Sequence, residues 1–543
     1  MNAIVLISDS FRRDHLGCYG NPWIHTPHLD RLAEKSAVFE QYYAASYPTV
    51  PNRWDLCTGR FGFTQRGWQP LERGDVTWGQ ILSRNGVHTQ MIWDTPMLGA
   101  HDYNYTKGFQ GMEFVHGQKG DSSITDPRLQ LDLKAQPHKI RNAAALAGYL
   151  RNHHGRTFER EYCVGRTIST AMDWIETNHT RDPFLLWVDM WDPHEPFDCP
   201  SYDYERYADP TYDGDVMHYP EYGRANYMTD AERRHLKALY AGNVTLADRW
   251  VGSFLDLADR LGLFRNTLII WASDHGHLFG DHDLQGKPGG ELGRLYEVTA
   301  RVPLLVRHPD GLGAGQRVSG IVQPPDVLPT VLDAMGVGIP NQVEGRSFLP
   351  LMDGSRGDRP YAFSSRFPPA AALPGYRSGD GAAFDGWVGS DRNVEPSTVT
   401  GDEWAYLAAP VGMSSELYNL RDDPGQTQNV LDSHRDVADR MREAWIAFLR
   451  QHGASDERIR PFLDGSVEVR TPRSATLFAI RDDHGLWIAF EKEQRARRAA
   501  YLDGAPGPRR SVEEVTFGAV FDDNPRNLMH AFGQYYWAED FAS

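Results

Sequence analysis

The chain has 543 residues, which is too long for one ordinary core, so we expect a large domain with smaller additions. Hydrophobic residues make up 41% and charged residues 24%, a globular composition that excludes a disordered chain. The formal net charge of −17 lacks the basic footprint of a general nucleic-acid-binding protein, so we expect no nucleic-acid partner.

The cysteines and the N-terminus indicate an intracellular protein. Cys18, Cys57, Cys163 and Cys199 lack the spacing of a zinc knot or a redox motif, and free thiols are the favoured interpretation. The N-terminus has no basic segment, and its apolar run stops at Ser8, which is unlike a signal peptide. No apolar run has the length that a bilayer span requires. We therefore expect a cytoplasmic protein without a membrane partner.

Short apolar runs alternate with helix-like stretches along the first two thirds of the chain. The strand-like runs are Ala3–Ile7, Phe184–Val188, Leu268–Ala272 and Val302–Val306. The helix-like stretches are Asp30–Phe39, Thr77–Asn85, Arg166–Asn178 and Ala231–Leu261. This alternation predicts an α/β fold with a large, mostly parallel sheet sandwiched by helices. Ligands of such sheets bind beyond the carboxyl ends of the strands.

The remainder of the chain indicates two further segments. After a loop rich in Ala, Gly and Pro at 368–388, the predicted elements are strands Trp404–Ala408 and Glu416–Leu420 and the helix Val437–Gln451. We predict a catalytic α/β domain over 1–375, a small C-terminal α+β domain over 376–455 and an extension over 456–543.

The extension contains strand-like runs at Ala475–Ile480 and Leu486–Phe490 and an aromatic tail at Phe517–Ser543. Aromatic side chains in a terminal arm need a surface, either on the chain's own main domain or on a neighbouring subunit. We expect a homo-oligomer.

Carboxylate and imidazole groups follow the predicted strands. Asp9 follows the first run, Asp189 and His194 follow the second, and Asp274 and His275 follow the third. These groups meet only if the sheet order places the strands side by side.

Several segments, in this order, carry a family resemblance. They are Asp9–Gly20, Thr26–Ala33, Thr49–Arg53 with Thr58–Arg60, Pro193–Phe197, Asp274–Gly276 with Gly280–His282 and Lys287, Arg301–Leu304, Asp326–Thr330, and Glu416–Leu420 with Asp423–Gly425. The set resembles the sulfatases of the alkaline phosphatase superfamily, with their phosphonate monoester hydrolase and phosphodiesterase relatives. It covers residues 1 to about 450, and each segment is weak alone.

The sequence departs from the usual sulfatase pattern at three places. Ser10 follows Asp9 where paired Asp residues are usual, and His275 follows Asp274 where Asn is frequent. The Asp-His pair is nearer to the phosphodiesterase and phosphonate hydrolase branch. The family's lysine-bearing segment is replaced by Trp93-Asp94-Thr95, in which Thr95 is a candidate for the pocket wall.

The resemblance implies a metal site and a catalytic set. Asp9, Thr49, Asp274 and His275 would bind one divalent metal ion, and their oxygen and imidazole donors suit Mn²⁺, Zn²⁺ or Fe²⁺ better than Ca²⁺. The catalytic set consists of the nucleophile Thr49, Arg53 one helical turn later to grip the nucleophile or the substrate anion, Lys287 on a non-bridging oxygen, and His194 at the leaving group.

Thr49 stands where sulfatases have a Cys or Ser that becomes formylglycine. A threonine cannot give that aldehyde because its Cβ carries a methyl group, so we expect no formylglycine. An ester on Thr49 would have to be released by water attack at the central atom, a course that phosphoryl groups tolerate. The nearby Cys57 has no Pro at the required place and is interpreted as a buried structural thiol.

The favoured function is hydrolysis of phosphate or phosphonate esters, and the partner is a small anionic ester. A sulfatase and an inactive, sulfatase-like binding protein are the alternatives. A transferase is a third, which the lack of a membrane span disfavours.

Three of these candidate site residues also have a structural interpretation. Asp9 could be a helix N-cap, and His194 and Lys287 could lie in solvent-exposed loops. The possible ligands of a second metal are His277, His282, Asp189 and Asp192, and for these a structural role is favoured.

Overall fold

The computed structural model describes residues 1–99, 103–121, 123–126, 128–129, 131–355, 357–367 and 395–463, and the backbone of 473–481, 487–491 and 511–521. The predicted loop at 368–388 and most of the aromatic tail lie outside these residues.

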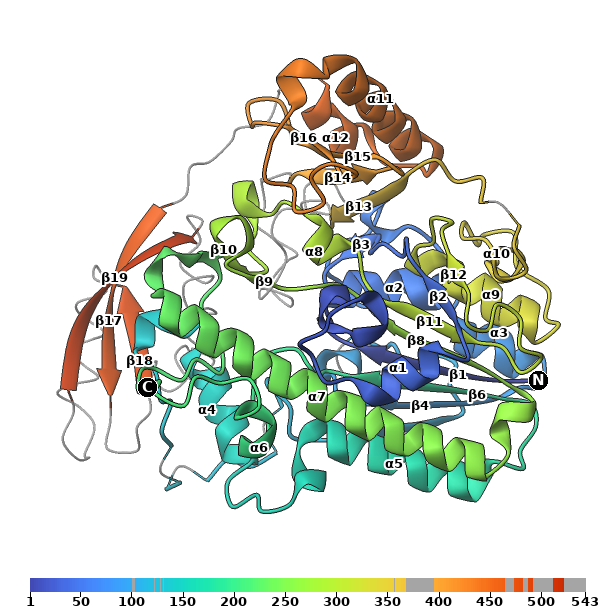
Figure 1. Cartoon of the computed structure of the whole chain (residues 1–543), viewed down its shortest axis with the longest axis horizontal. Coiled ribbons are helices and arrows are strands. Elements are labelled where there is room, and N and C mark those ends of the chain that lie inside the picture. The colour runs from blue at the N-terminus through green and yellow to red at the C-terminus, as the bar shows by residue number, and fades with distance from the viewer. Residues whose placement is uncertain are drawn as a thin grey trace.

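An eight-stranded sheet forms the centre of the molecule, in the order β12-β2-β11-β8-β1-β6-β4-β5 (Figure 1). Its strands are β1 Asn2–Ser8, β2 Ala37–Phe39, β4 His88–Trp93, β5 Gly111–Phe114, β6 Phe184–Met190, β8 Thr267–Ser273, β11 Leu304–Arg307 and β12 Arg317–Val318. β11 runs antiparallel to β8 and β2, whereas the other neighbouring pairs are parallel. The structure thus confirms the predicted mostly parallel sheet.

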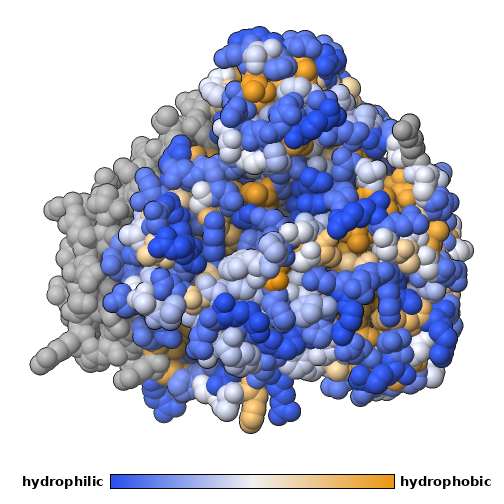
Figure 2. All heavy atoms as spheres, viewed as in Figure 1, coloured by the Kyte–Doolittle hydropathy of each residue, from blue (hydrophilic) through white to orange (hydrophobic). Residues whose placement is uncertain are grey.

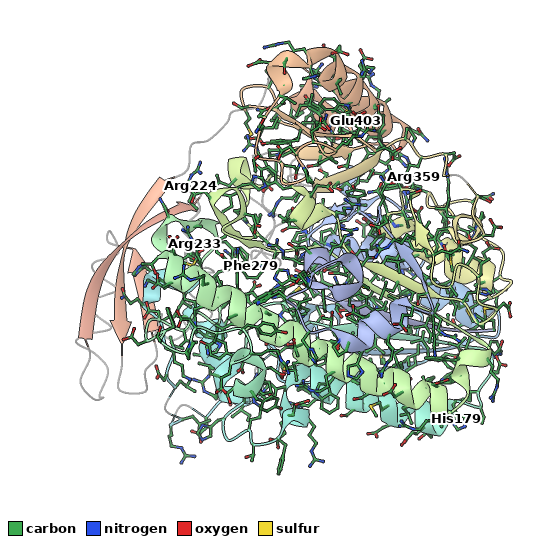
Figure 3. The ribbon with its side chains drawn as sticks, in the orientation of Figure 1. His179, Arg224, Arg233, Phe279, Arg359 and Glu403 are labelled. Atoms are coloured by element: carbon green, nitrogen blue, oxygen red, sulfur yellow. The ribbon has the colours of Figure 1, made fainter. Side chains whose placement is uncertain are left out.

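Helices cover both faces of this sheet (Figure 1). On one face lie α1 Pro27–Ala33, α5 Cys163–Asn178 and α7 Asp230–Arg260. On the other lie α2 Thr49–Thr58, α3 Trp78–Arg84 and α9 Val327–Ala334. The remaining helices of this part are α4 Ala143–Asn152, α6 Ser201–Tyr204, α8 Glu297–Ala300 and α10 Leu349–Met352. Figure 3 shows the two ends of the layer: His179, which caps α5, lies where the strands begin, and Phe279 lies toward their carboxyl ends.

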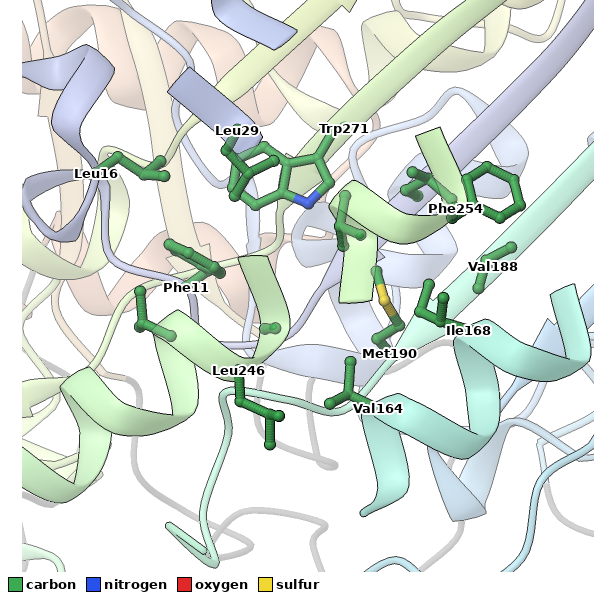
Figure 4. Close-up of a cluster of buried hydrophobic side chains, with 14 of the residues drawn as sticks. Phe11, Leu16, Leu29, Val164, Ile168, Val188, Met190, Leu246, Phe254 and Trp271 are labelled. Carbon is green, nitrogen blue, oxygen red and sulfur yellow. The ribbon is translucent and has the colours of Figure 1, made fainter. Parts of the chain in front are cut away.

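The core follows from the alternation of side chains along the strands. In β1, Ile4 and Leu6 belong to the cluster under α1, α5 and α7, while Val5 and Ile7 belong to the cluster under α2, α3 and α9. Figure 4 shows part of the first cluster, in which Trp271 of β8 lies among aliphatic side chains. A strand that is buried on both faces reads as a continuous apolar run, which is why these strands are visible in the sequence.

A second sheet, in the order β16-β15-β14-β13-β3, carries the helix α11 Arg435–Gln451. Its strands are β3 Ser46–Tyr47, β13 Ala362–Arg366, β14 Ser397–Thr400, β15 Trp404–Ala408 and β16 Glu416–Asn419, and α12 Asp456–Ile459 packs beside α11. β3 pairs in parallel with β13, so a segment of the N-terminal region completes a sheet made from the C-terminal region.

Two small sheets complete the described elements. They are β7-β10-β9, made of Gly223–Arg224, Leu284–Gly286 and Leu278–Phe279, and β18-β17-β19, made of Trp487–Glu491, Arg473–Arg481 and Ser511–Phe521. The division of the chain into domains remains a prediction.

One predicted helix is wrong in its second half. The stretch Asp30–Phe39 was expected to be helical, but α1 ends at Ala33 and residues Ala37–Phe39 form β2. Val38 pairs with Leu305 of β11 and with Arg317 of β12, and this pairing within the central sheet overrides the local helical pattern.

The visible surface in Figure 2 is mostly hydrophilic, and its hydrophobic residues form separate patches. Within the described part of the chain, no helix combines the length and the apolar character that a membrane span would need.

Candidate active site

The sheet order brings the carboxylates at the strand ends together. β1 lies between β6 and β8, so Asp9, Asp189 and Asp274 meet at one edge of the sheet. All three are almost completely buried. The three strands are therefore side by side, which is the condition for these groups to meet.

Thr49 reaches the same point from the start of α2. Its Oγ1 lies 3.3 Å from Nε2 of His275, the residue after Asp274. The approach to α2 is fixed by Asp55, whose carboxylate accepts hydrogen bonds from the backbone N–H (2.6 Å) and the Oγ–H (2.7 Å) of Ser46 in β3. Thr49 is therefore held at the boundary between the two sheets.

Arg53 lies one turn after Thr49 and is fully buried. Its Nε donates to Asp189 Oδ2 (2.9 Å), and its Nη2 donates to Asp189 Oδ1 (3.1 Å) and to Asp9 Oδ2 (3.3 Å). Its Nη1 pairs with Asp274 Oδ2. All three nitrogens bind carboxylates, so in this structure Arg53 orders the acidic groups; its contact with the nucleophile or the substrate anion stays a prediction.

The residues fit a divalent metal ion. Ligand atoms of Asp9, Asp274 and His275 all lie within 4.8 Å of one another, and no other such group of three occurs in the described ranges. His275 Nδ1 lies 2.9 Å from the carbonyl oxygen of Gly276, which places the proton on Nδ1 and leaves the Nε2 lone pair facing Asp9 and Asp274. Burial lowers the pKa of His275 to about 4, so the imidazole is neutral, as a metal ligand must be.

The charges of the site also favour a bound cation. Burial and the neighbouring charge of Asp274 raise the pKa of Asp9 well above its usual value. Burial also opposes the charge of Asp274, but Arg53 and His275 hold the pKa of that carboxyl at about 2. Two buried carboxylates that repel each other beside a neutral imidazole form a site that a cation would stabilise.

Lys287 and His194 both lie next to Glu195 and are buried, in contrast to the exposed positions considered above. Lys287 Nζ lies 3.3 Å from Ser10 Oγ and 3.3 Å from Glu195 Oε2. His194 Nδ1 lies 2.7 Å from the carbonyl oxygen of Glu195, and the ring packs on Trp191 at a centroid distance of 3.9 Å. Burial and the charge of Lys287 lower the pKa of His194 well below its usual value.

The sequence analysis assigned no role to Glu195 and considered Asp189 only as a possible ligand of a second metal, and the structure places each of them at the centre of a network. Glu195 contacts Lys287, His277 and the hydroxyl of Tyr222, and although burial opposes its charge, Lys287 holds its pKa at about 2. In the sequence, Glu195 stands next to His194 in a segment flanked by Pro193 and Pro196, a pattern that indicates only a loop.

The four residues considered for a second metal do not form a site with one another in the described part of the chain. Asp189 binds Arg53 and Thr95, Asp192 accepts from Gln118 (3.2 Å), His277 contacts Glu195, and His282 stacks on Tyr296. Thr95 donates to Asp189 Oδ1 (2.8 Å). Cys57 is a buried free thiol, as expected.

The comparisons with known proteins identify the family. The chain is 26% identical to an arylsulfatase of Clostridium perfringens, over 65% of this chain and 78% of that one, and 25% identical to an endo-4-O-sulfatase of Bacteroides thetaiotaomicron, over 81% and 87%. The fold is similar to a phosphonate monoester hydrolase of Agrobacterium radiobacter, with a TM-score of 0.65 and 21% identity over 83% of this chain and 96% of that one. The profile described as Sulfatase matches residues 1–337, and the chain belongs to the sulfatase family, ester hydrolases of the alkaline phosphatase superfamily.

Proposed function

We propose that the chain hydrolyses phosphate or phosphonate esters and that Thr49 is the nucleophile. The observation that carries the proposal is the place of Thr49: its buried hydroxyl lies 3.3 Å from Nε2 of His275, beside Asp9 and Asp274. A threonine in this place cannot become formylglycine, so release by elimination of sulfate is closed to it. Phosphoryl esters can instead be released by water.

Asp9, Thr49, Asp274 and His275 would hold one divalent metal ion. When bound, that ion supplies positive charge that stabilises the ionised hydroxyl and the anionic ester. The mixed oxygen and nitrogen donors favour Mn²⁺ or Zn²⁺ over Ca²⁺.

The residues of the chain position the reaction. Thr49 Oγ1, at the start of α2, gives its proton to solvent and forms a bond to the central atom, while the bond from that atom to the leaving oxygen breaks. The N-terminus of a helix favours the negative charge that develops there. Arg53 keeps Asp9 and Asp274 in place, and Lys287 holds a non-bridging oxygen as a point charge.

His194 would act at the leaving group and at the entering water. Its Nδ1–H is directed at the carbonyl oxygen of Glu195, so Nε2 is the atom that faces a substrate. A histidine with a lowered pKa is neutral in the free protein, which suits it to accept a proton from water when the Thr49 ester is cleaved. The leaving oxygen takes a proton from the same imidazole only if the bound anion has raised its pKa.

A sulfatase is the second candidate. It is favoured by the curated relatives, among them an arylsulfatase and an endo-4-O-sulfatase, whereas the phosphonate monoester hydrolase favours the first candidate through its fold alone. A sulfated Thr49 would then need release by water attack at sulfur.

The test is a screen of matched 4-nitrophenyl phosphate, phosphate diester, phosphonate and sulfate esters with Mn²⁺ and Zn²⁺, carried out on the parent, Thr49→Ala and Thr49→Ser. We expect phosphoryl esters to be preferred, Thr49→Ala to lose at least about 1,000-fold in kcat, and Thr49→Ser to retain part of the activity. Parent-like rates in Thr49→Ala would disprove the nucleophile. A preference for the sulfate ester would establish the second candidate, and no turnover of any ester would favour an inactive binding protein.

A further inference from the structure

Lys119 is a half-buried cation close to the candidate active site. It follows β5 along the chain, and its Nζ donates to the hydroxyl of Tyr219 (3.1 Å). The same Nζ lies 4.9 Å from the ring centroid of Trp191 and 4.7 Å from that of Tyr219. An ammonium group that is partly removed from water therefore rests between two aromatic rings.

Lys119 differs from the other cations of this region in its partners. Lys287 pairs with Glu195 at 3.3 Å, and Arg141 pairs with Glu221 at 3.5 Å. Among the residues that the structure describes, no carboxylate lies within ion-pair distance of Lys119 Nζ; its contacts are a hydroxyl and two rings. Burial opposes the charge of Lys119 more than Glu195, which is already paired with Lys287, favours it, so an anion that enters beside Lys119 would stabilise the site.

Lys119 shares an aromatic neighbour with His194, the residue that is proposed to act at the leaving group. Trp191, the ring beneath its ammonium group, also packs against His194 at 3.9 Å. Lys119 and His194 thus border the same indole. The transferred group has its own cation in Lys287, which lies near Ser10 and is directed toward the carboxylate cluster.

The segment that carries Lys119 is well anchored. Gln118 is buried, donates to Asp192 Oδ2 (3.2 Å), and accepts from the backbone N–H of Lys119 (3.2 Å). The backbone N–H of Trp191 is fixed by Asp94 Oδ1 (2.7 Å). Both the cation and its aromatic support are therefore preorganised, which favours a specific contact over a chance surface charge.

We propose that Lys119 binds a negatively charged group on the leaving-group side of the substrate, so that the enzyme selects esters whose organic part carries a second anion. The proposal rests on the proposed function, in which His194 faces the leaving group. Carboxylate, sulfate and phosphate share the chemistry that an ammonium group beside a phenol hydroxyl recognises.

The test compares 4-nitrophenyl phosphate with 3-carboxy-4-nitrophenyl phosphate, which adds a carboxylate to the same leaving group. The readout is the ratio of kcat/KM for the carboxylated ester to kcat/KM for the uncharged one. Lys119→Met should lower this ratio about 10- to 100-fold, because the carboxylated ester loses one charge-assisted hydrogen bond. Lys119→Arg should restore part of it, because the charge returns.

Lys35→Met is the matched control, since Lys35 is exposed in the turn after α1. It should leave the ratio unchanged. A ratio in Lys119→Met equal to that of the parent would overturn the proposal. If kcat/KM falls equally for both esters, Lys119 acts on the transferred group instead. Lys119→Gln gives a second charge-free variant if the methionine variant does not fold.

Failure of the proposed function would look different. If the parent cleaves neither ester, the product 5-hydroxy-2-nitrobenzoate is titrated into the parent and Lys119→Met by calorimetry. Weaker binding to the variant, by about tenfold or more, would support the anion site independently of turnover. Equal binding would refute the site.

Discussion

Replacing Arg53 by methionine removes a guanidinium that contacts three buried carboxylates and keeps a side chain of similar length. Asp9 and Asp274 retain hydrogen bonds from Ser10, whereas Asp189 keeps only the hydroxyl of Thr95 among its side-chain partners. Asp189 is therefore the carboxylate most affected.

The size of the effect can be worked from protonation. Burial already raises the pKa of Asp189 against the opposing charge of Arg53, and without Arg53 it should rise further. Keeping a carboxyl protonated costs about 1.4 kcal/mol for each pH unit by which the solution exceeds its ordinary pKa. At pH 7 the excess is ~3 pH units, so the cost is about 4 kcal/mol. This agrees with the ~3–5 kcal/mol expected when one partner of a buried ion pair is removed.

The same reasoning fixes the pH dependence. The folded variant binds a proton that the unfolded chain releases near its ordinary pKa, so the variant loses stability as pH rises through that range. Because the parent already bears part of this cost at Asp189, the difference from the parent should be at most about 4 kcal/mol at pH 7 and at most about 1.5 kcal/mol at pH 5.

Urea unfolding followed by tryptophan fluorescence, with chelator present, measures this difference. Arg31→Met is the control, because Arg31 is half exposed in its pair with Asp256 (3.4 Å) and should contribute less than about 1 kcal/mol. A loss below about 1 kcal/mol at pH 7 for Arg53→Met, or a loss that does not change with pH, would refute the reasoning.

Three further predictions follow from other parts of the molecule. Mn²⁺ at about 100 times its Kd should stabilise the parent by about 2.7 kcal/mol in the same unfolding assay, and His275→Ala should abolish the gain; equal gains would place the metal elsewhere. The preference for the carboxylated ester should decline between about pH 7 and pH 9, because burial lowers the pKa of Lys119 to about 8; a flat ratio would contradict this. Removing the residues after Phe517 should lower the number of subunits per particle, measured by light scattering, and an unchanged number of subunits would count against tail-mediated assembly.

Much of the site could be predicted because its residues stand directly after buried strands. Apolar runs of five residues each predicted β1, β6 and β8, which are seven residues long, and Asp9, Asp274 and His275 come directly after them. Their convergence could not be predicted, since strand order is a property of long-range packing.

Other features were invisible for the same reason. The antiparallel direction of β11 leaves no trace in an apolar run that is buried on both faces. Lys119 and Glu195 lie in irregular segments, and their proximity to the site depends on how β5 and β6 are placed in the sheet.

The pairing of β3 with β13 also bears on synthesis of the chain. The strand before Thr49 pairs with residues 365–366, and Arg366 donates to the carbonyl oxygen of Lys287 (3.0 Å). Asp9, Thr49 and Lys287 therefore leave the ribosome well before the strand that locks two of them in place. A nascent chain that contains Asp9, Thr49 and Lys287 but not β13 cannot hold these residues in their final positions. The site should become competent only when β13 has been added.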